Sequence, residues 1–254
     1  KSNKFKHNMM IGQINEVFFM KYLICFDMDR VLVDYLSTWQ YVYDKLGINN
    51  DEAFNLYNQG KLEEWDWLKL DIALIKDASP GIDDDELRSL CEGTPLMKGI
   101  DECLGWLIEN GHEIAIISGG MQETATQIAK KYSSSKPWTR RWGGIEKSQN
   151  DTLMHVFTNG WLRNSDGIIG DFGRYQVQMN GKGTIVQLLQ RRLSIPKERT
   201  ISIGDSAGDI SMFEESGLSI CFNPWDEKPK KFADMTIEEK DLRKVLSQIM
   251  QFME

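Results

Sequence analysis

Short apolar runs recur along the chain, and helical patterns lie between them. The four clearest runs are 22–26 (YLICF), 113–118 (EIAIIS), 200–204 (TISIG) and 218–222 (LSICF). A continuous run of this length is typical of a strand buried on both faces in a parallel sheet. The segments with helical periodicity are 99–109, 121–132, 183–193 and 209–215. This alternation predicts an α/β fold with a Rossmann-like, doubly wound parallel sheet. In such sheets the ligand binds beyond the carboxyl ends of the strands.

Residues 34–95 interrupt the alternation with a long stretch of helical character that is rich in Trp, Tyr, Leu and acidic residues. The acidic run 83–86 (DDDE) resembles a helix start, where carboxylates lie at the positive end of the helix dipole. The stretch is too long for a loop and has no strand pattern. We therefore expect a small helical cap domain at 34–95, inserted into an α/β core made of 20–33 and 96–254.

Three further segments stand apart from the alternation. Two β-like runs, 155–163 and 168–179, are joined by NSDG, whose Asp-Gly pair predicts a β-hairpin flap. The basic and aromatic stretch 130–142 binds a second phosphate, stacks on a base, or is a surface loop, and the acidity of the chain favours the loop. Residues 1–19 lack the continuous apolar core of a secretory signal. We interpret them as a leader or remnant, with the natural start at Met20.

Composition narrows the possible partners. The net charge of −8 argues against broad attraction to nucleic acid or to an anionic membrane. No apolar run approaches the ~18 residues that a membrane helix needs. The four cysteines are scattered and histidines number only three, so we expect free thiols in a reducing compartment and no structural zinc site. These features predict a cytoplasmic protein.

Polar signatures follow three of the predicted strands and precede one helix. They are DMDRV at 27–31, ISGG at 117–120, GKG at 181–183 and GDSAGD at 204–209. Any one alone is weak, because carboxylates at strand ends often cap helices and Gly-Lys-Gly is usually a turn. All four, in this order on an alternating α/β pattern, make a strong signal.

These four motifs resemble those of the haloacid dehalogenase (HAD) superfamily, which read DxDx[TV], Ser/Thr, Lys and GDxxx[DN]. The resemblance covers residues 22–223, and the helical insert, the ISGG motif and the hairpin are most similar to the phosphoserine-phosphatase-like branch. It implies a Mg²⁺-dependent phosphatase that hydrolyses a small phosphorylated metabolite through an aspartyl phosphate. It also implies that the insert acts as a lid over the site.

The chemistry of the acidic residues agrees with that assignment. A carboxylate nucleophile, for which Asp27 is the candidate, replaces one hard step with two easier ones. Two anions must then meet, and Mg²⁺ with its oxygen ligands can bridge them. Asp27 and Asp205 supply carboxylates, and the resemblance adds the main-chain carbonyl of Asp29 and nearby Asp209. Asp29 lies two residues after Asp27, so in an extended strand both face one side, and its proposed role is general acid and then base.

The phosphate itself needs hydrogen-bond donors and positive charge. Ser118 can donate to a phosphoryl oxygen, as can the N–H groups of Gly119 and Gly120. Lys182 adds a point charge that stabilises the nucleophile and the transferring group. Arg30 stands where the family more often has a small residue. Its side chain is directed at the substrate phosphate, at the cap, or into the site as a hindrance, and the sequence leaves these alternatives open.

Two residues depart from the resemblance and bear on the substrate. Phosphoserine phosphatases have a Glu nine residues after the nucleophile, where this chain has Leu36, and an Asn where it has Gly208. Both differences disfavour phosphoserine as the substrate. Two other functions stay open. One is a phosphotransferase or phosphomutase on the same fold. The other is a catalytically silent phosphate-binding module.

Overall fold

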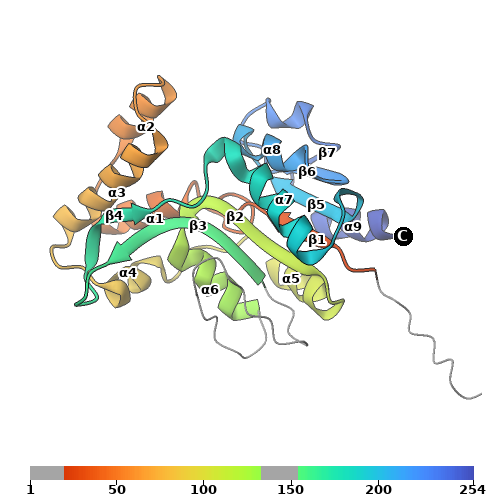
Figure 1. Cartoon of the computed structure of the whole chain (residues 1–254), viewed down its shortest axis with the longest axis horizontal. Coiled ribbons are helices and arrows are strands. Elements are labelled where there is room, and N and C mark those ends of the chain that lie inside the picture. The colour runs from red at the N-terminus through yellow and green to blue at the C-terminus, as the bar shows by residue number, and fades with distance from the viewer. Residues whose placement is uncertain (1–19, 133–153) are drawn as a thin grey trace, which may run out of the picture.

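The computed structural model describes residues 20–132 and 154–254, and in them a seven-stranded sheet forms the centre of the protein (Figure 1). Its strand order is β4-β3-β2-β1-β5-β6-β7. Every pairing is parallel except that of β3 with β4. The strands are β1 (Leu23–Phe26), β2 (Glu113–Met121), β3 (Met154–Arg163), β4 (Ile169–Arg174), β5 (Thr200–Gly204), β6 (Leu218–Phe222) and β7 (Met235–Ile237).

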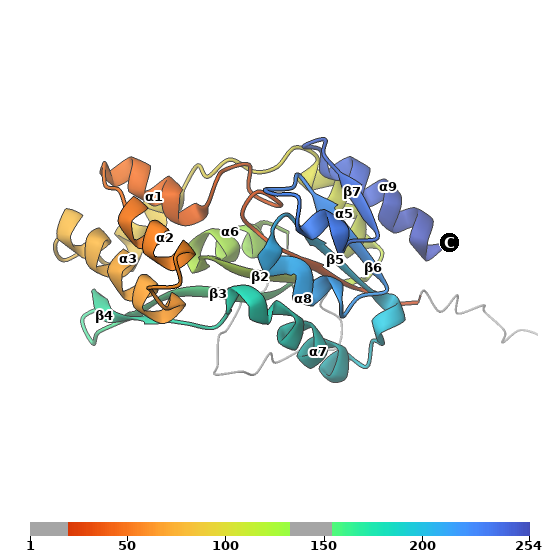
Figure 2. The same cartoon turned by 90° about the horizontal axis from the view of Figure 1, so that it is seen from above.

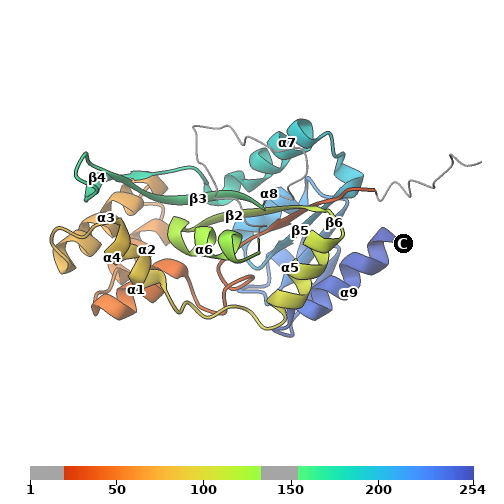
Figure 3. The same cartoon turned by 90° about the horizontal axis from the view of Figure 1, so that it is seen from below.

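Helices cover both faces of this sheet, as Figures 2 and 3 show. On one face lie α5 (Ile100–Glu109), α6 (Gln122–Tyr132) and α9 (Leu242–Met253), and on the other lie α7 (Lys182–Leu193) and α8 (Ile210–Phe213). Strand β1 shows why both faces are apolar. Ile24 and Phe26 point into the first layer while Leu23 and Cys25 point into the second, and all four are fully buried. The doubly wound α/β fold is therefore confirmed.

The observed elements match the predicted ones over most of the core and differ from them at a few places. Strand β2 continues to Met121, three residues beyond its predicted end, and the second hairpin strand is shorter than predicted because it ends at Arg174. The predicted helix 209–215 is short and is preceded by a 3₁₀ turn, Ala207–Asp209. Strand β7 and helix α9 lie after the last predicted strand.

The insert between β1 and α5 contains four helices. They are α1 (Thr38–Leu46), α2 (Asp51–Asn58), α3 (Glu64–Ala78) and α4 (Asp84–Cys91). Apolar side chains of α1, α3 and α4 form a cluster separate from the two layers of the sheet, and this cluster includes Trp161 and Ile169 from the hairpin. In Figure 1 the four helices lie at the left with the tip of the hairpin. The division of the chain into core and cap at 34–95 stays a prediction.

The hairpin connects the sheet with the insert. The first half of β3 pairs with β2 as far as Asn159, and the second half pairs with β4 against helix α3. A Cβ on Gly173 would lie 2.5 Å from Leu68 of α3, so the two elements approach each other closely. The indole N–H of Trp161 also donates to Asp84 of α4 over 3.1 Å. The distal hairpin and the insert thus pack as one body.

Some sequence predictions concern segments that lie outside the described residues. These segments are the proposed leader 1–19 and most of the basic and aromatic stretch, 133–142. Among the described residues, no helix combines the length and the apolarity needed to cross a bilayer.

Candidate active site

Three neighbouring parallel strands bring the sequence motifs to one edge of the sheet. Phe26 at the end of β1 is in register with Ile116 of β2 and Ile203 of β5. Asp27, Ser118 and Asp205 follow these positions by one or two residues, so they emerge side by side. This placement follows from the parallel register alone, because carboxyl ends of parallel strands meet at the same edge.

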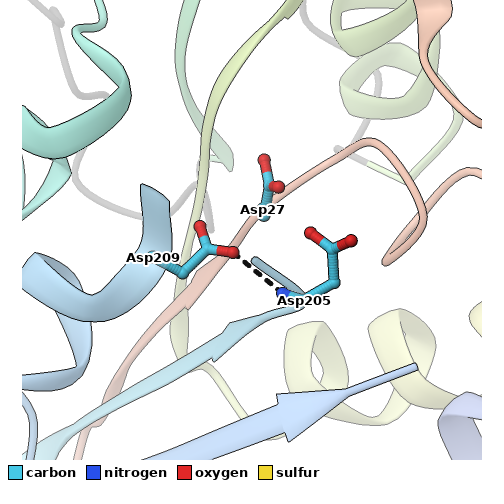
Figure 4. Close-up of side chains that lie close together, drawn as sticks. All are labelled: Asp27, Asp205 and Asp209. Carbon is cyan, nitrogen blue, oxygen red and sulfur yellow. Dashed lines mark hydrogen bonds between the residues drawn. The ribbon is translucent and has the colours of Figure 1, made fainter. Parts of the chain in front are cut away.

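Three buried carboxylates form the centre of the site (Figure 4). Asp27, Asp205 and Asp209 each offer one oxygen, and these oxygens lie within 4.8 Å of one another. The Oδ2 atom of Asp209 accepts the N–H groups of Asp205 and Ser206 at 2.8 Å and 3.0 Å, which fixes its orientation. A Cβ on Gly204 would lie 2.3 Å from the carboxyl carbon of Asp209, so the motif needs glycine there.

Lys182 joins two of these carboxylates. Its ammonium lies 2.9 Å from Oδ1 of Asp27 and 2.6 Å from Oδ1 of Asp209, and the residue is 4% exposed. Burial lowers the pKa of Lys182, but the two carboxylates outweigh it and hold the pKa above that of an ordinary lysine. The first residue of α7 therefore supplies a permanent positive charge to the site.

The balance of charges in the site favours binding of a divalent cation. Burial, followed by repulsion from neighbouring carboxylates, raises the pKa of Asp205, and burial is also the largest cause of the raised pKa of Asp27. Four carboxylates (Asp27, Asp29, Asp205, Asp209) face two cationic side chains, Lys182 and Arg30. All the donors are oxygens and the carboxylates outnumber the cationic side chains, which fits a hard divalent ion.

Asp29 lies at the border between the sheet and the insert. Its Oδ1 accepts the backbone N–H of Thr38 at 2.9 Å, in the first turn of α1. The Thr38 hydroxyl in turn accepts the N–H of Met121 over 2.7 Å. Burial and then the charge of Asp27 raise the pKa of Asp29 to about 7. A carboxyl with this pKa can donate and accept a proton near neutral pH.

The ISGG motif packs beside the DMD segment. The Ser118 hydroxyl accepts the N–H of Gly120 at 3.1 Å, and the residue is 2% exposed. A Cβ on Gly120 would lie 2.5 Å from Met28 and 2.7 Å from Asp29 and Thr38, so only glycine fits this position. The carbonyl of Gly119 accepts the indole N–H of Trp39 at 3.1 Å. Phosphate binding by Ser118, Gly119 and Gly120 stays a prediction.

The side chain of Arg30 is directed at the carboxylate cluster. Its Nε atom donates to Oδ2 of Asp205 at 2.8 Å, and its Nη2 atom donates to the carbonyl of Asn223 at 2.9 Å. This contact places Arg30 beside the candidate metal ligand Asp205, a role that was not among the alternatives weighed from the sequence. Contact between Arg30 and a phosphate group stays a prediction.

Sequence reasoning missed three residues of this region. Thr38, Asn223 and Trp225 belong to no motif, yet each contacts a motif residue. Asn223 immediately follows β6, so the rule that ligand-binding residues lie at the carboxyl ends of strands could have identified it. For Thr38 and Trp225 the sequence offers no comparable signal.

Comparison with known proteins agrees with the motif analysis. A family model described as haloacid dehalogenase-like hydrolase matches residues 176–249, which include Lys182, Asp205 and Asp209. The phosphoserine phosphatase of Methanocaldococcus jannaschii is 27% identical over 233 residues, covering 90% of this chain and 98% of the relative. That of Wolinella succinogenes is 27% identical over 231 residues, covering 89% and 99%.

Solved structures give the same result in three dimensions. A substrate-bound phosphoserine phosphatase complex superimposes with a TM-score of 0.71 at 25% identity, covering 91% of this chain and 99% of that chain. A phospho-aspartyl intermediate analogue of phosphoserine phosphatase gives a TM-score of 0.69 at 26% identity, covering 90% and 99%.

Proposed function

Because the chain belongs to the haloacid dehalogenase superfamily, in its phosphoserine-phosphatase-like branch, we propose that it hydrolyses a small phosphomonoester through an aspartyl phosphate on Asp27. The observation that carries the proposal is the contact of one buried lysine with both Asp27 and Asp209, beside Asp205. The phospho-aspartyl analogue reported for a similar phosphatase supports the covalent intermediate.

The first half of the reaction uses Asp27 and Asp29. The Oδ1 atom of Asp27 accepts the N–H of Met28 at 2.7 Å and the Lys182 ammonium at 2.9 Å, so we assign the attack on phosphorus to Oδ2. The new bond joins Oδ2 to phosphorus while the ester P–O bond breaks. Asp29 gives its proton to the leaving oxygen. Lys182 stabilises the negative charge of the transition state, in which the Asp27 carboxylate approaches the phosphate group.

The second half returns Asp27 to its starting form. Asp29, now ionised, takes a proton from a water molecule, whose oxygen attacks phosphorus and breaks the aspartyl P–O bond. Inorganic phosphate leaves, and both carboxyl groups regain their original protonation. The raised pKa of Asp29, about 7, suits it to both directions of proton transfer.

A divalent cation, which we propose to be Mg²⁺, would be held by Asp27 and Asp205, with Asp209 close by. The main-chain carbonyl of Asp29 is a further ligand that the resemblance implies. When bound, the ion would supply electrostatic stabilisation of phosphoryl oxygens. The three clustered carboxylates fit this group because all donors are oxygens.

The function is tested by phosphate release from p-nitrophenyl phosphate, after dialysis against EDTA and then with added Mg²⁺. We expect activity that depends on Mg²⁺ and is lost again when EDTA is added, because the acidic site repels a phosphate dianion without the cation. Equal rates with EDTA and with Mg²⁺ would contradict the proposed role of the metal.

The protonation of Asp29 predicts a specific pH dependence. The carboxyl group must be protonated to act as an acid, so kcat/KM for an alkyl phosphate should fall as the pH rises above about 7. Hydrolysis of p-nitrophenyl phosphate should vary less, because its leaving group needs no proton. Asp29→Asn should slow alkyl phosphate hydrolysis by about 10²–10⁴-fold and p-nitrophenyl phosphate hydrolysis by a smaller factor. Equal losses on both substrates would count against the acid role.

The substrate is a small phosphorylated metabolite, and we propose that it is not phosphoserine. Leu36 has no charge to bind an amine, and its side chain is half-exposed between β1 and α1. Gly208 likewise offers no side chain, and a Cβ there would lie 3.1 Å from the carbonyl oxygen of Met179. A phosphate-release screen over a metabolite panel that includes phosphoserine tests this. Phosphoserine as the best substrate would contradict it.

A further inference from the structure

Arg30 is the centre of a set of contacts that joins three loops at the edge of the sheet. Its guanidinium donates to Asp205 after β5 and to the carbonyl of Asn223 after β6, at 2.8 Å and 2.9 Å. The side-chain amide of Asn223 donates back to the carbonyl of Arg30 at 3.0 Å. Each of these two residues thus binds the backbone of the other, which fixes the loop after β1 against the loop after β6.

Trp225 completes the set. The guanidinium carbon of Arg30 lies 5.0 Å from the centre of the indole ring, and the backbone N–H of Trp225 donates to the backbone carbonyl of Asp205 at 2.8 Å. The tryptophan is 54% exposed, so it is not held there by burial in a core. A guanidinium over an indole face is an attractive arrangement. We refer to Arg30, Asn223, Trp225 and Asp205 as the Arg30 clamp.

The backbone of the clamp adopts an uncommon conformation at two positions. Arg30 has a φ of 62° and Asn223 a φ of 47°, both in the left-handed region that residues other than glycine rarely adopt. With this backbone conformation, the side chain of Arg30 reaches Asp205. Such a backbone persists only where surrounding contacts hold it, and the contacts of the clamp supply that constraint.

We propose that Arg30 is a positioning residue that orients Asp205 as a ligand of the divalent cation. This inference rests on the proposed function. Arg30 holds Oδ2 of Asp205, and one oxygen of the same carboxylate lies within 4.8 Å of the oxygens offered by Asp27 and Asp209. The guanidinium also donates to the carbonyl of Asn223 and lies over the ring of Trp225. Groups that bind and orient a metal ligand commonly change metal affinity by about 10–100-fold when removed.

If Arg30 affected the site only through its charge, its removal would change Mg²⁺ affinity in the direction opposite to that expected from a positioning role. This difference allows a clear test. Removing a positive charge beside a cation site reduces repulsion and should tighten binding of Mg²⁺. Loss of orientation should weaken it, because Asp205 would then have to be ordered when the ion binds. The direction of the change therefore separates the two roles.

The test is calorimetric titration of the purified chain with Mg²⁺, which measures binding without turnover. We expect Arg30→Met to weaken binding by about tenfold or more. Arg30→Lys should also weaken binding, because it keeps the charge but loses the planar fork that reaches Asp205 and Asn223 together. Trp225→Leu should cause a smaller loss in the same direction. Arg191→Met, at an exposed position of α7, is the matched control and should bind as the wild type does.

Each outcome bears on the inference. Unchanged or tighter binding by both Arg30 variants, with wild-type binding intact, would overturn the positioning role and leave the proposed function standing. A wild-type chain that binds no Mg²⁺ would overturn both. Circular dichroism of each variant shows that it is folded, and Trp225→Leu keeps the inference testable if Arg30→Met fails to fold.

Discussion

Asp27→Asn should abolish turnover while leaving the protein folded. The amide is a poor nucleophile, so no aspartyl phosphate forms and the rate of phosphate release should fall by at least about 10³-fold. Asn has nearly the same shape and keeps an oxygen that can accept the Lys182 ammonium. The fold should persist, because Asp27 is one of several mutually repelling carboxylates and its own charge is opposed by burial.

Two measurements check this result. Phosphate release gives the loss of rate, and mass spectrometry of acid-quenched enzyme shows whether a phosphoryl group is attached to the chain. The wild type should show the adduct during turnover and Asp27→Asn should not. Asp34→Asn is the matched control, because Asp34 is in the same segment but pairs with Lys240 at the surface. Full activity of the Asp27 variant would refute the covalent mechanism.

Lys182→Met should damage both stability and catalysis. The change leaves Asp27 and Asp209 buried without their shared cation, and removing one partner of a buried ion pair typically costs about 3–5 kcal/mol of folding free energy. The rate of hydrolysis should also fall by about 10²–10³-fold, as is typical when a donor that stabilises transition-state charge is lost. No other change that we consider combines two effects of this size.

The stability effect has a definite pH dependence. Without Lys182, the pKa of Asp27 in the folded state should rise further above that in the unfolded chain, because burial already raises it and the lysine opposes that rise. The folded state then binds more protons than the unfolded state, so stability falls as the pH rises. In urea unfolding, the loss relative to the wild type should be larger at pH 8 than at pH 5.

Added Mg²⁺ should partly restore stability at pH 8, because a ligand that binds the folded state stabilises it by mass action. Lys240→Met, at an exposed ion pair, is the matched control and should change little. A loss that does not depend on pH would show that packing, and not unpaired charge, is responsible.

The sequence predicts the core of the fold well, because strands buried in a parallel sheet occur in the sequence as short apolar runs. Each of the four runs is mainly apolar, and its ends lie within one residue of those of the observed strand except at the end of β2. Parallel pairing then places the motif residues that follow β1, β2 and β5 at one edge. No knowledge of side-chain conformation is needed for that step.

The elements near the C-terminus have less distinct sequence patterns. Strand β7 has only three residues, none of them buried, so its sequence has no continuous apolar run. Helix α9 could have been found, because Leu242, Val245 and Ile249 are spaced on one face and Asp241 caps its first turn.

The contacts of Arg30 could not have been predicted. They depend on a positive φ at residue 30 and on a tryptophan nearly two hundred positions away in the chain. Side-chain contacts between segments so distant in sequence follow from the loop conformations, and single-sequence patterns carry little information about these. The same reason explains why the bond from Thr38 to Asp29 was missed.

The packing of the hairpin against the insert limits how the insert can move relative to the sheet. Helix α3 lies directly on β4 at Gly173, and Trp161 of β3 is bonded to α4. A free swing about the chain connections at 34–37 and 92–99 would pull these surfaces apart and expose the apolar cluster between them. Opening should instead carry the ribbon along, so that β3 bends where it leaves β2 after Asn159. The stiffness of one two-stranded ribbon would then set the amplitude of the motion and the access to the candidate active site.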